Sequence, residues 1–191
     1  MIYEAIISTI DTLGNAHVTP FGISMHDDLV VISPYKPSTT LDNILATEHA
    51  VMNLTDDVRV FAGALTKRQA WALLPASKVT GFRLADTLAH KELKLVKVID
   101  DALRPQLFME VLHAEQHQAF NGFNRAQAAV IELAVLVSRL TRLPMEQIKQ
   151  DITYHTIAIE KTAGARELEA WGWLMEAVTN HQAALNGDNI A

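Results

Sequence analysis

The spacing of apolar residues changes about two-thirds of the way along the chain, and this change constrains the fold more than any other feature. Up to residue 122, short runs rich in β-branched residues alternate with turn residues, which is typical of strands. From Asn124 onward, apolar residues recur every three or four positions, which is typical of amphipathic helices. The sequence therefore predicts an α+β protein with two domains, residues 1–122 and 123–191.

The first domain is predicted to be an antiparallel β-barrel with one early helix. Turns at 12–15 and 26–28 separate the first three apolar runs, which indicates a meander. Thr39 and Asp42 have capping-box spacing at the start of the helix. The predicted strands are 2–10, 16–25, 29–33, 51–54, 58–65, 93–99 and 107–120, and the predicted helix is 39–50. Several short strands with so little helix favour a barrel.

The second domain is predicted to be a small three-helix bundle. Asn124 is a candidate N-cap with Gln127 three residues later, Pro144 follows the end of the first helix, and Gly164 separates the last two. The apolar positions are Ala126, Val130, Leu133, Val137 and Leu140, then Ile148, Ile152, His155 and Ile159, then Leu168, Trp171, Met175 and Val178. So short a bundle buries little surface, so we expect its apolar faces to dock on the barrel or on a second copy of the chain.

Composition and charge exclude several functional classes. The chain has no cysteine, which excludes disulfides, thiolate metal sites, cysteine nucleophiles and iron–sulfur clusters. Residues 1–66 contain eight acidic and two basic side chains, whereas 67–191 contain fourteen of each, so the whole net charge of −6 lies in the first third. Duplex binding needs a basic stripe that this chain lacks, and we expect no nucleic-acid partner.

The first residues and the hydropathy pattern favour a cytoplasmic location. The N-terminal MIYEAIISTI has no positively charged stretch of the kind that opens a secretory signal. Uncharged apolar runs stay well short of the ~18 residues of a membrane-spanning helix. We therefore expect neither export nor a membrane partner.

Several segments carry a family resemblance. The segments STIDTLGNAHVTPFGIS, SPYKPSTTLDNI and AVMNLTDDVRVFAGAL resemble the FMN-binding split-barrel proteins related to flavin reductases. The segment FNGFNRAQAAVIELAVLVSRL, followed by IEKT, is similar to the C-terminal part of a narrower, functionally uncharacterised family of that superfamily. The resemblance implies an antiparallel split barrel, FMN as the cofactor, and a homodimer with FMN at its interface.

The start of the early helix is the candidate phosphate site. It offers an ammonium, three hydroxyls and an amide beside the free N–H groups of the first helical turn, which favour an anion. The candidate residues are Lys36, Ser38, Thr39, Thr40 and Asn43. In the alternative interpretation, Thr39 only caps the helix and Lys36 is solvated.

The second candidate segment is Thr19, Pro20, Phe21 and Gly22, within a predicted strand. Proline cannot donate to a ladder, so Pro20 implies an edge, a bulge or a break, and Gly22 allows a close approach to the backbone. The resemblance implies that this segment lies against the isoalloxazine ring. The alternative is an ordinary barrel corner. Asn53 is a further candidate for the same pocket.

The histidines are candidates for metal binding or proton transfer. His113, Glu115 and His117 alternate, so they would share one face of a strand, but no third imidazole is near in the sequence. We therefore expect no metal site and a solvated strand face. His17 and His49 are closer to the candidate flavin segments, and either could donate a proton.

A charged stripe accompanies the apolar face of the helix that follows Asn124. Arg125, Glu132 and Arg139 are spaced seven residues apart, and such stripes are usually solvated. The resemblance makes Arg125 a candidate ligand of an anion at the junction of barrel and bundle. An interdomain ion pair is the alternative.

Two functional hypotheses follow. The first is an FMN-dependent oxidoreductase, a homodimer with the flavin at its interface, acting on a small-molecule substrate and an electron donor that the sequence does not identify. The second is a non-catalytic flavin-binding or sensing protein whose helical bundle is an interaction surface. The cofactor would carry the chemistry in the first case, and no residue stands out as catalytic.

Overall fold

The computed structural model describes residues 1–68 and 71–188, which form two compact units. One unit comprises Met1–Asp56 and Ala70–Phe120 and contains the described strands. The other comprises Asp57–Gln69 and Asn121–Ala191 and contains four of the described helices. The segment Asp57–Gln69 therefore belongs to the helical unit, although it lies in the sequence between the two parts of the barrel.

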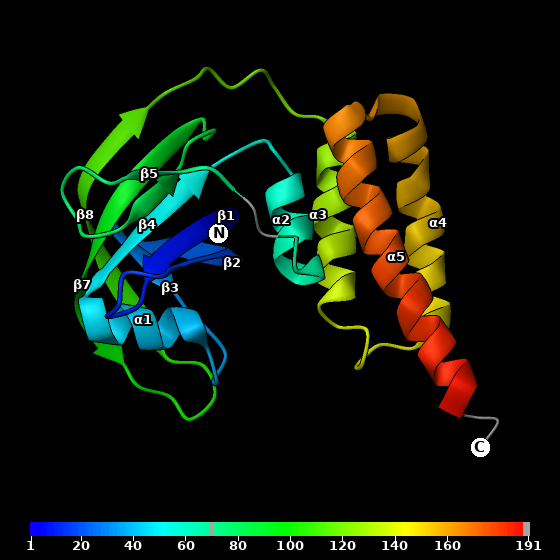
Figure 1. Cartoon of the computed structure of the whole chain (residues 1–191), viewed down its shortest axis with the longest axis horizontal. Coiled ribbons are helices and arrows are strands. Elements are labelled where there is room, and N and C mark those ends of the chain that lie inside the picture. Colours follow the sequence, from blue (N-terminus) through cyan, green and yellow to red (C-terminus); the bar gives the residue numbers. More distant parts are fainter. Residues whose placement is uncertain (69–70, 189–191) are drawn as a thin grey trace. The chain divides into compact units, whose positions relative to one another are not determined.

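The strand unit is a closed antiparallel barrel (Figure 1), as the sequence predicts. The strand order around the barrel is β1 (Ile2–Ile10), β2 (Ala16–His26), β3 (Leu29–Ile32), β8 (Gln106–Gln116), β7 (Ala89–Ile99) and β4 (His49–Leu54). The bounds of β1 agree with the prediction residue for residue. The largest differences among these strands are in β7, which begins four residues earlier than predicted because Ala89 and His90 pair with both β4 and β8, and in β8, which ends four residues earlier than predicted.

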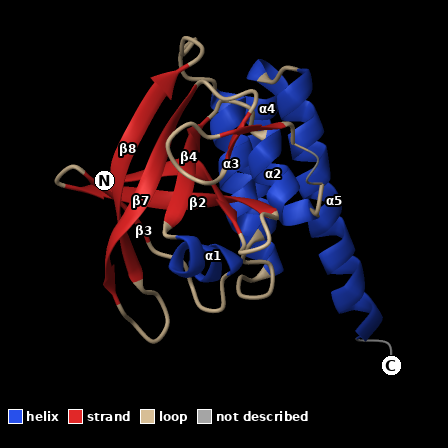
Figure 2. Cartoon of the chain, turned by 60° about the vertical axis from the view of Figure 1, so that its left-hand side comes forward, coloured by secondary structure: helices blue, strands red, loops and turns tan. Residues whose placement is uncertain are grey.

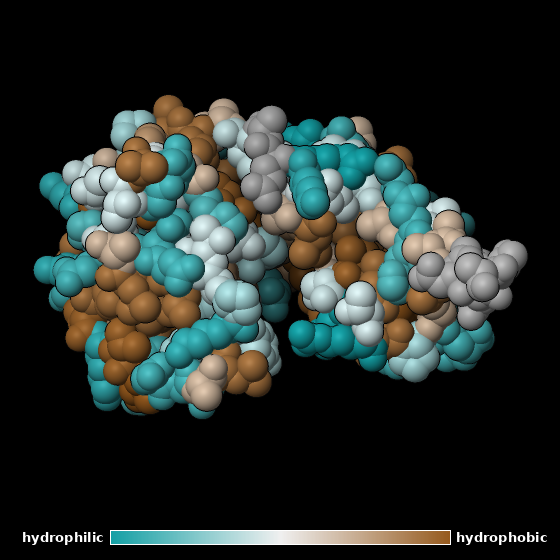
Figure 3. All heavy atoms as spheres, turned by 60° about the horizontal axis from the view of Figure 1, so that its bottom comes forward, coloured by the Kyte–Doolittle hydropathy of each residue, from teal (hydrophilic) through white to brown (hydrophobic). Residues whose placement is uncertain are grey.

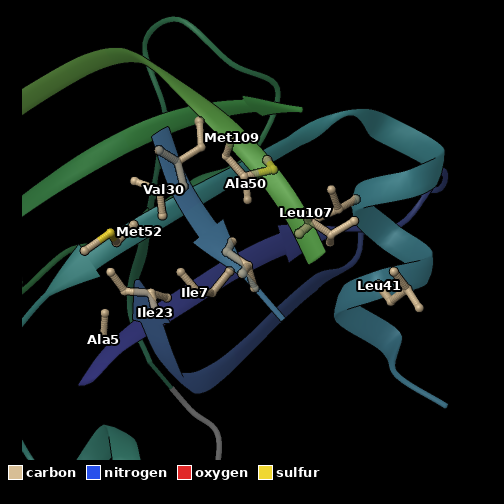
Figure 4. Packing of buried hydrophobic residues seen from close by; sticks show 12 residues of the cluster. Ala5, Ile7, Ile23, Val30, Leu41, Ala50, Met52, Leu107 and Met109 are labelled. Atoms are coloured by element: carbon tan, nitrogen blue, oxygen red, sulfur yellow. The ribbon is translucent and has the colours of Figure 1, made fainter. Parts of the chain in front are cut away.

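Alternate side chains of the strands fill the barrel. Ala5 and Ile7 of β1 point inward with Ile23 of β2 and Met52 of β4 (Figure 4). The buried members of this core are Ala5, Ile7, Ile23, Val30, Ile32, Leu41, Ile44, Ala50, Met52, Leu93, Leu107 and Met109. Burying aliphatic side chains from six strands and one helix supplies the main favourable free energy of this unit.

Helix α1 (Thr39–Thr47) covers one end of the barrel (Figures 1 and 2). Its Leu41 and Ile44 belong to the barrel core, so burial fixes the helix there. The N-cap is Ser38, whose side chain accepts a hydrogen bond from the N–H of Leu41. The predicted capping box at Thr39 is therefore wrong by one residue. The helix ends before Glu48, which has a left-handed conformation with φ 62°.

The predicted strand 58–65 is wrong, because this segment forms helix α2 (Arg59–Thr66) of the helical unit. Its composition, apolar except for Arg59 and Gly63, suits either a buried strand or a buried helix. Tertiary packing decides between them: Val58 and Ala62, one helical turn apart, are buried in the core of the helical unit.

A small two-stranded sheet that the sequence did not predict covers part of the barrel wall. It consists of β5 (Leu73–Pro75) and β6 (Phe82–Leu84), which are too short to show a hydrophobic period. The hydroxyl of Ser8 donates to the carbonyl of Phe82 at 2.6 Å, and the N–H of Leu84 donates to Asn53 at 2.8 Å. These bonds hold β6 against β1 and β4.

The helical unit packs α2 together with α3 (Arg125–Val137), α4 (Met145–Thr162) and α5 (Ala165–Asp188). The predicted three-helix bundle is thus present, and α2 adds a fourth helix to its core. The buried core residues are Val58, Ala62, Ala126, Ala129, Val130, Leu133, Ala134, Ile148, Ile159, Ala170, Leu174 and Val178. Trp171 and Trp173 are partly buried against this core. None of the helices, as far as the chain is described, combines the length and hydropathy needed to cross a membrane.

Candidate functional site

The candidate ring-binding segment lies on an open part of β2. Thr19 to Gly22 pair with Ile7 to Glu4 of β1 in continuous register, so the ladder contains no bulge there. Within the described chain, β3 pairs with β2 only at Ser24–His26. The preceding residues of β2 therefore have one strand neighbour, and Pro20 occupies an edge position, as a residue without an N–H requires. All four candidate residues are half-buried.

Gly22 is closely approached, although by the neighbouring strand. A Cβ at this position would lie 3.0 Å from Cγ2 of Ile2 and 3.4 Å from Oε1 of Glu4. Because Gly22 has no side chain, the side chains of Ile2 and Glu4 of β1 can lie close to its backbone. Any larger residue here would displace Ile2.

The hydroxyl-rich start of α1 divides into an exposed and a buried part. Ser38 is half-buried and Thr39 is exposed, so their hydroxyls are accessible at the helix start. Thr40 is 1% exposed and Asn43 is 5% exposed, and the amide of Asn43 donates to the hydroxyl of Thr9 at 3.0 Å. Thr40 and Asn43 therefore seat α1 on the barrel, which leaves Ser38 and Thr39 facing outward.

Lys36 is held by the connection between β7 and β8. Its Nζ donates to Oδ1 of Asp100 and to the carbonyl of Asp101, both at 2.9 Å. The hydrogen bond and the charge of Lys36 lower the pKa of the exposed Asp100 carboxyl. Lys36 therefore matches neither interpretation of the sequence. Its ammonium is paired with Asp100, so it is not free to bind a phosphate, and it is not simply solvated.

The two candidate segments flank the same pair of strands. Asn43 ties α1 to Thr9 of β1, and Thr9 is paired with His17 of β2. Thr19 lies two residues further along, about 7 Å away at the usual rise of a strand. Burial lowers the pKa of His17, so its imidazole is neutral near pH 7. His49 begins β4, paired with Lys94.

Asn53 is placed inside the barrel wall. It is fully buried, and its amide nitrogen lies 3.0–3.3 Å from the carbonyls of Ile6 and Val51 and the hydroxyl of Ser8. Its carbonyl oxygen accepts from the N–H of Leu84. These contacts link β1, β4 and β6 and use both ends of the amide. Asn53 therefore differs from the other candidate residues, because its side chain holds the barrel wall together.

Arg125 lies in the helical unit as the first residue of α3, and it is exposed. Asn124 before it is the N-cap, as predicted: its side-chain oxygen accepts from the N–H groups of Ala126 and Gln127. Its amide also donates to the carbonyl of Thr162 at 3.0 Å, which ties the start of α3 to the end of α4. Glu132 is exposed as well, as expected for a solvated stripe.

An ion-pair network in the helical unit was not singled out from the sequence. Arg59 of α2 donates to both carboxylate oxygens of Asp57, at 2.6 Å for the shortest contact, and to Glu169 of α5 at 3.2 Å. The hydrogen bond with Asp57 is the main cause that raises the pKa of Arg59. The side chain of Asp57 is 7% exposed, so this pairing keeps a buried carboxylate satisfied.

A second cluster gathers imidazoles and carboxylates on one face of β7 and β8. His90 and Glu92 of β7 lie opposite Glu115 and His113 of β8, and His117 follows the end of β8. Nδ1 of His90 lies 2.9 Å from Nε2 of His117, and Nε2 of His90 lies 3.2 Å from Glu92. The alternation of His113, Glu115 and His117 pointed to this face, but only the register of the ladder adds His90 and Glu92.

Glu92 is a fully buried carboxylate. It accepts hydrogen bonds from the N–H groups of Ser77, Lys78 and Val79, from the hydroxyl of Ser77 and from His90. Burial raises the pKa of Glu92, but these hydrogen bonds outweigh it and lower the pKa to about 2. The group is therefore ionised, and it fixes both the 77–79 segment and the ring of His90.

The fold is similar to that of several solved proteins. A structure of the FMN-bound protein MM1853 from Methanosarcina mazei matches with a TM-score of 0.78 at 20% identity, over 92% of this chain and 94% of that one. The 2-nitrobenzoate 2-nitroreductase NbaA of Pseudomonas fluorescens matches with a TM-score of 0.53 at 23% identity, over 60% and 64%. The NADH:FAD oxidoreductase SgcE6 of Streptomyces globisporus C-1027 matches with 0.51 at 11% identity, over 60% and 70%.

The first of these structures extends through both units, whereas the other two cover about the length of the barrel. A search of the curated proteins finds none that matches. Two family models match in succession: the N-terminal domain of a protein of unknown function (DUF447) at residues 3–118, and a second model of the same description at residues 124–176. These two matches span most of the chain, which therefore belongs to the DUF447 family and has the split-barrel fold that the sequence led us to expect.

Proposed function

We propose that this protein binds FMN on the barrel, with the phosphate at the start of α1 and the ring against Thr19–Gly22 of β2. The observation that carries the proposal is the half-buried, one-sided stretch of β2 beside the capped start of α1. The similarity over 92% of the chain to a protein that was crystallised with FMN supports the choice of ligand.

The start of α1 suits a phosphate group. The Thr39 hydroxyl is exposed and the Ser38 hydroxyl is half-buried, and the first N–H groups of a helix favour an anion. Residues 1–66 are otherwise strongly acidic, so a phosphate here depends on these local donors and not on the general field of the barrel. Lys36 contributes little to this site because Asp100 already neutralises it.

The open part of β2 suits the isoalloxazine ring. An edge strand presents outward N–H and C=O groups that can pair with the polar rim of a planar ligand. Phe21 is half-buried against the barrel core and offers apolar area for the ring on the same face as Thr19, whereas Gly22 points to the opposite face. His17 is half-buried two residues before Thr19, and burial lowers its pKa, so its neutral imidazole can accept a proton or donate a hydrogen bond beside the flavin.

We further propose that two chains associate through the barrel. Large apolar side chains reach its surface, seen as brown areas on the left of Figure 3. Ile2 is 67% exposed next to Gly22, and Tyr35 and Leu103 are 55% and 60% exposed near the start of α1. Exposed apolar groups that border a ligand site are typical of an interface.

The proposed activity is that of an oxidoreductase acting on a small molecule. FMN would supply hydride or electron transfer, and the residues of this chain would hold the flavin and exclude water, with the neutral imidazole of His17 available as a proton acceptor. The similar folds of a nitroreductase and an NADH:FAD oxidoreductase support this reaction class.

Titration of FMN against the purified protein, followed by quenching of flavin fluorescence, tests the site. We expect binding to weaken several-fold in Thr39→Ala and at least tenfold in Thr39→Glu, because a carboxylate would repel the phosphate where the hydroxyl donated to it. Thr153→Ala, an exposed helical threonine of α4, is the matched control and should bind as the wild type does. Absence of quenching by excess FMN in the folded wild type would reject the proposal.

Anaerobic mixing of the FMN-loaded protein with NADH or NADPH then tests the reaction class. An oxidoreductase of the proposed kind bleaches the flavin absorption within seconds to minutes. Tight FMN binding without bleaching by either donor would instead favour the non-catalytic flavin-binding hypothesis. Sedimentation of the same sample measures whether the flavin-loaded species is a dimer.

A further inference from the structure

The cluster on β7 and β8 has the composition of a transition-metal site and lies outside the proposed flavin site. Imidazole nitrogens and carboxylate oxygens are the ligands of zinc and related divalent ions. Ligand atoms of His90, His113 and Glu115 all lie within 4.8 Å of one another. Four ligands placed tetrahedrally at about 2.0–2.1 Å from zinc lie about 3.3 Å apart, so small side-chain rotations would close this set around an ion.

Glu92 fixes the orientation of the His90 ring and determines which of its nitrogens is free to bind a metal ion. An ionised carboxylate only accepts hydrogen bonds, so the 3.2 Å contact requires that Nε2 of His90 carry the proton. A neutral His90 then has its lone pair on Nδ1. Metal-binding histidines are commonly oriented in this way by a carboxylate behind the ring, and Glu92 is held rigidly by the N–H groups of 77–79.

The lone pair of His90 faces the other members of the cluster. Its Nδ1 lies 2.9 Å from Nε2 of His117, whose ring is stacked on that of His90 with 7° between the planes. Nε2 of His113 lies 3.7 Å from Oε2 of Glu115, and Nδ1 of His117 lies 3.9 Å from Oε1 of Glu115. An ion at this point would replace one hydrogen bond between imidazoles and leave the contact to Glu92 intact.

Charge and access also suit a dication. Glu92 and Glu115 together offset two positive charges, while Arg83, whose charge acts on His117, is bound to the carbonyls of Leu84 and Ala85. The side chain of His90 is 2% exposed, but those of His113 and Glu115 are 30% and 54% exposed. The cluster is therefore anchored at its buried side and open to solvent at the other.

We propose that His90, His113 and Glu115 bind a divalent transition-metal ion of the zinc class, with Glu92 orienting His90 and His117 beside it at the fourth position. The sequence argued against a metal here because His113 and His117 had no third imidazole nearby. The β7–β8 ladder supplies that imidazole from His90. The ion would join β7 to β8 at the barrel wall, independently of any flavin.

Metal-free protein titrated with Zn²⁺ by calorimetry, and with Co²⁺ by visible absorption, tests the proposal. We expect one ion per chain with a dissociation constant in the micromolar range or below, a cobalt spectrum typical of low coordination number, and no comparable binding of Mg²⁺. Glu115→Gln and His113→Ala should each weaken zinc binding at least tenfold, as expected when one of three ligands is lost. Both positions are partly exposed, so the variants should fold, which circular dichroism checks.

Two matched controls decide the result. His26→Ala removes another exposed histidine of the barrel, and Glu110→Gln removes another exposed carboxylate of β8. Both should bind zinc as the wild type does. Zinc should also raise the melting temperature of the wild type and of the controls but not of His113→Ala. The proposal is overturned if the wild type binds zinc no more tightly than His113→Ala and Glu115→Gln do, or if the controls lose binding equally.

Discussion

The barrel and the helical unit bury different kinds of side chain. The barrel buries a row of polar groups beside its aliphatic core, including Ser8, Asn43, Asn53, His90 and Glu92. The core of the helical unit consists of aliphatic and alanine side chains, and Asp57 and Glu167 are its buried charged residues in the described chain. A helix satisfies its own backbone, whereas the short irregular segment 76–81 between β5 and β6 needs the side chain of Glu92 as an acceptor for its N–H groups. The difference indicates that polar hydrogen bonds specify the barrel wall and that packing specifies the bundle.

Replacing Glu92 by alanine should give the largest effect. The substitution leaves the N–H groups of Ser77, Lys78 and Val79 without their acceptor inside the protein. We expect the free energy of unfolding to fall by about 3–5 kcal/mol, as when one partner of a buried charged network is removed. Urea unfolding measures the loss, and amide exchange should show that residues 77–79 open first.

The control for this change is Glu110→Gln on the neighbouring strand. Glu110 is exposed, so we expect its replacement to change the free energy of unfolding by less than about 0.5 kcal/mol. A loss at Glu92 as small as that at Glu110 would show that the barrel wall does not depend on its buried polar groups.

In the helical unit, the corresponding large effect should come from an apolar residue. Leu133 of α3 is fully buried in the core of the unit. Leu133→Ala removes its contacts and leaves a cavity, and we expect a loss of about 3 kcal/mol in the free energy of unfolding. Thermal unfolding measures it, with exposed Leu168→Ala of α5 as the matched control.

The composition and the flanking turn were enough to predict β1, but length and composition could not assign the segment 58–65. The run from Ile2 to Ile10 is rich in β-branched residues and is followed by the turn at 12–15, which is typical of a strand. The run from Val58 to Leu65, apolar except for Arg59 and Gly63, suits a buried strand and a buried helix equally well. Its structure depends on α3 and α5, which follow more than sixty residues later.

For the candidate sites too, the sequence predicts features that depend on neighbouring residues but not those that depend on strand register. The cap at Asn124 and the position of Pro20 depend on local chemistry: the structure places the cap as predicted, and of the edge, bulge or break that Pro20 implied, it shows the edge. The partners of Asn53 and the approach of His90 to His117 depend on strand register. The β7–β8 ladder has irregularities between Glu92 and Leu93 and between Leu95 and Lys97, which no alternation in the sequence reveals.

Ala62→Leu tests whether α2 is an integral part of the bundle. Ala62 is fully buried in the core of the helical unit, where an added isopropyl group has no space. We expect a loss of about 2 kcal/mol in the free energy of unfolding from overpacking. Ala46→Leu on the exposed face of α1 adds the same group and should change the stability by no more than about 0.5 kcal/mol. Equal, small effects would mean that α2 only rests on the bundle.

The smallest expected effect concerns Asn124, where the helical unit uses a polar side chain as the barrel does. Asn124 accepts from the N–H groups of Ala126 and Gln127 and donates to the carbonyl of Thr162. Asn124→Ala should lower the free energy of unfolding by about 1–1.5 kcal/mol, because the cap and the tie to α4 are lost together. Asn124→Ser keeps a capping oxygen but loses the amide donor, so its loss should be about half as large. If Asn124→Ala lowers the free energy of unfolding as much as Glu92→Ala does, polar hydrogen bonds specify the bundle as well. The two units would then differ in which residues they bury but not in the kind of interaction that determines their structure.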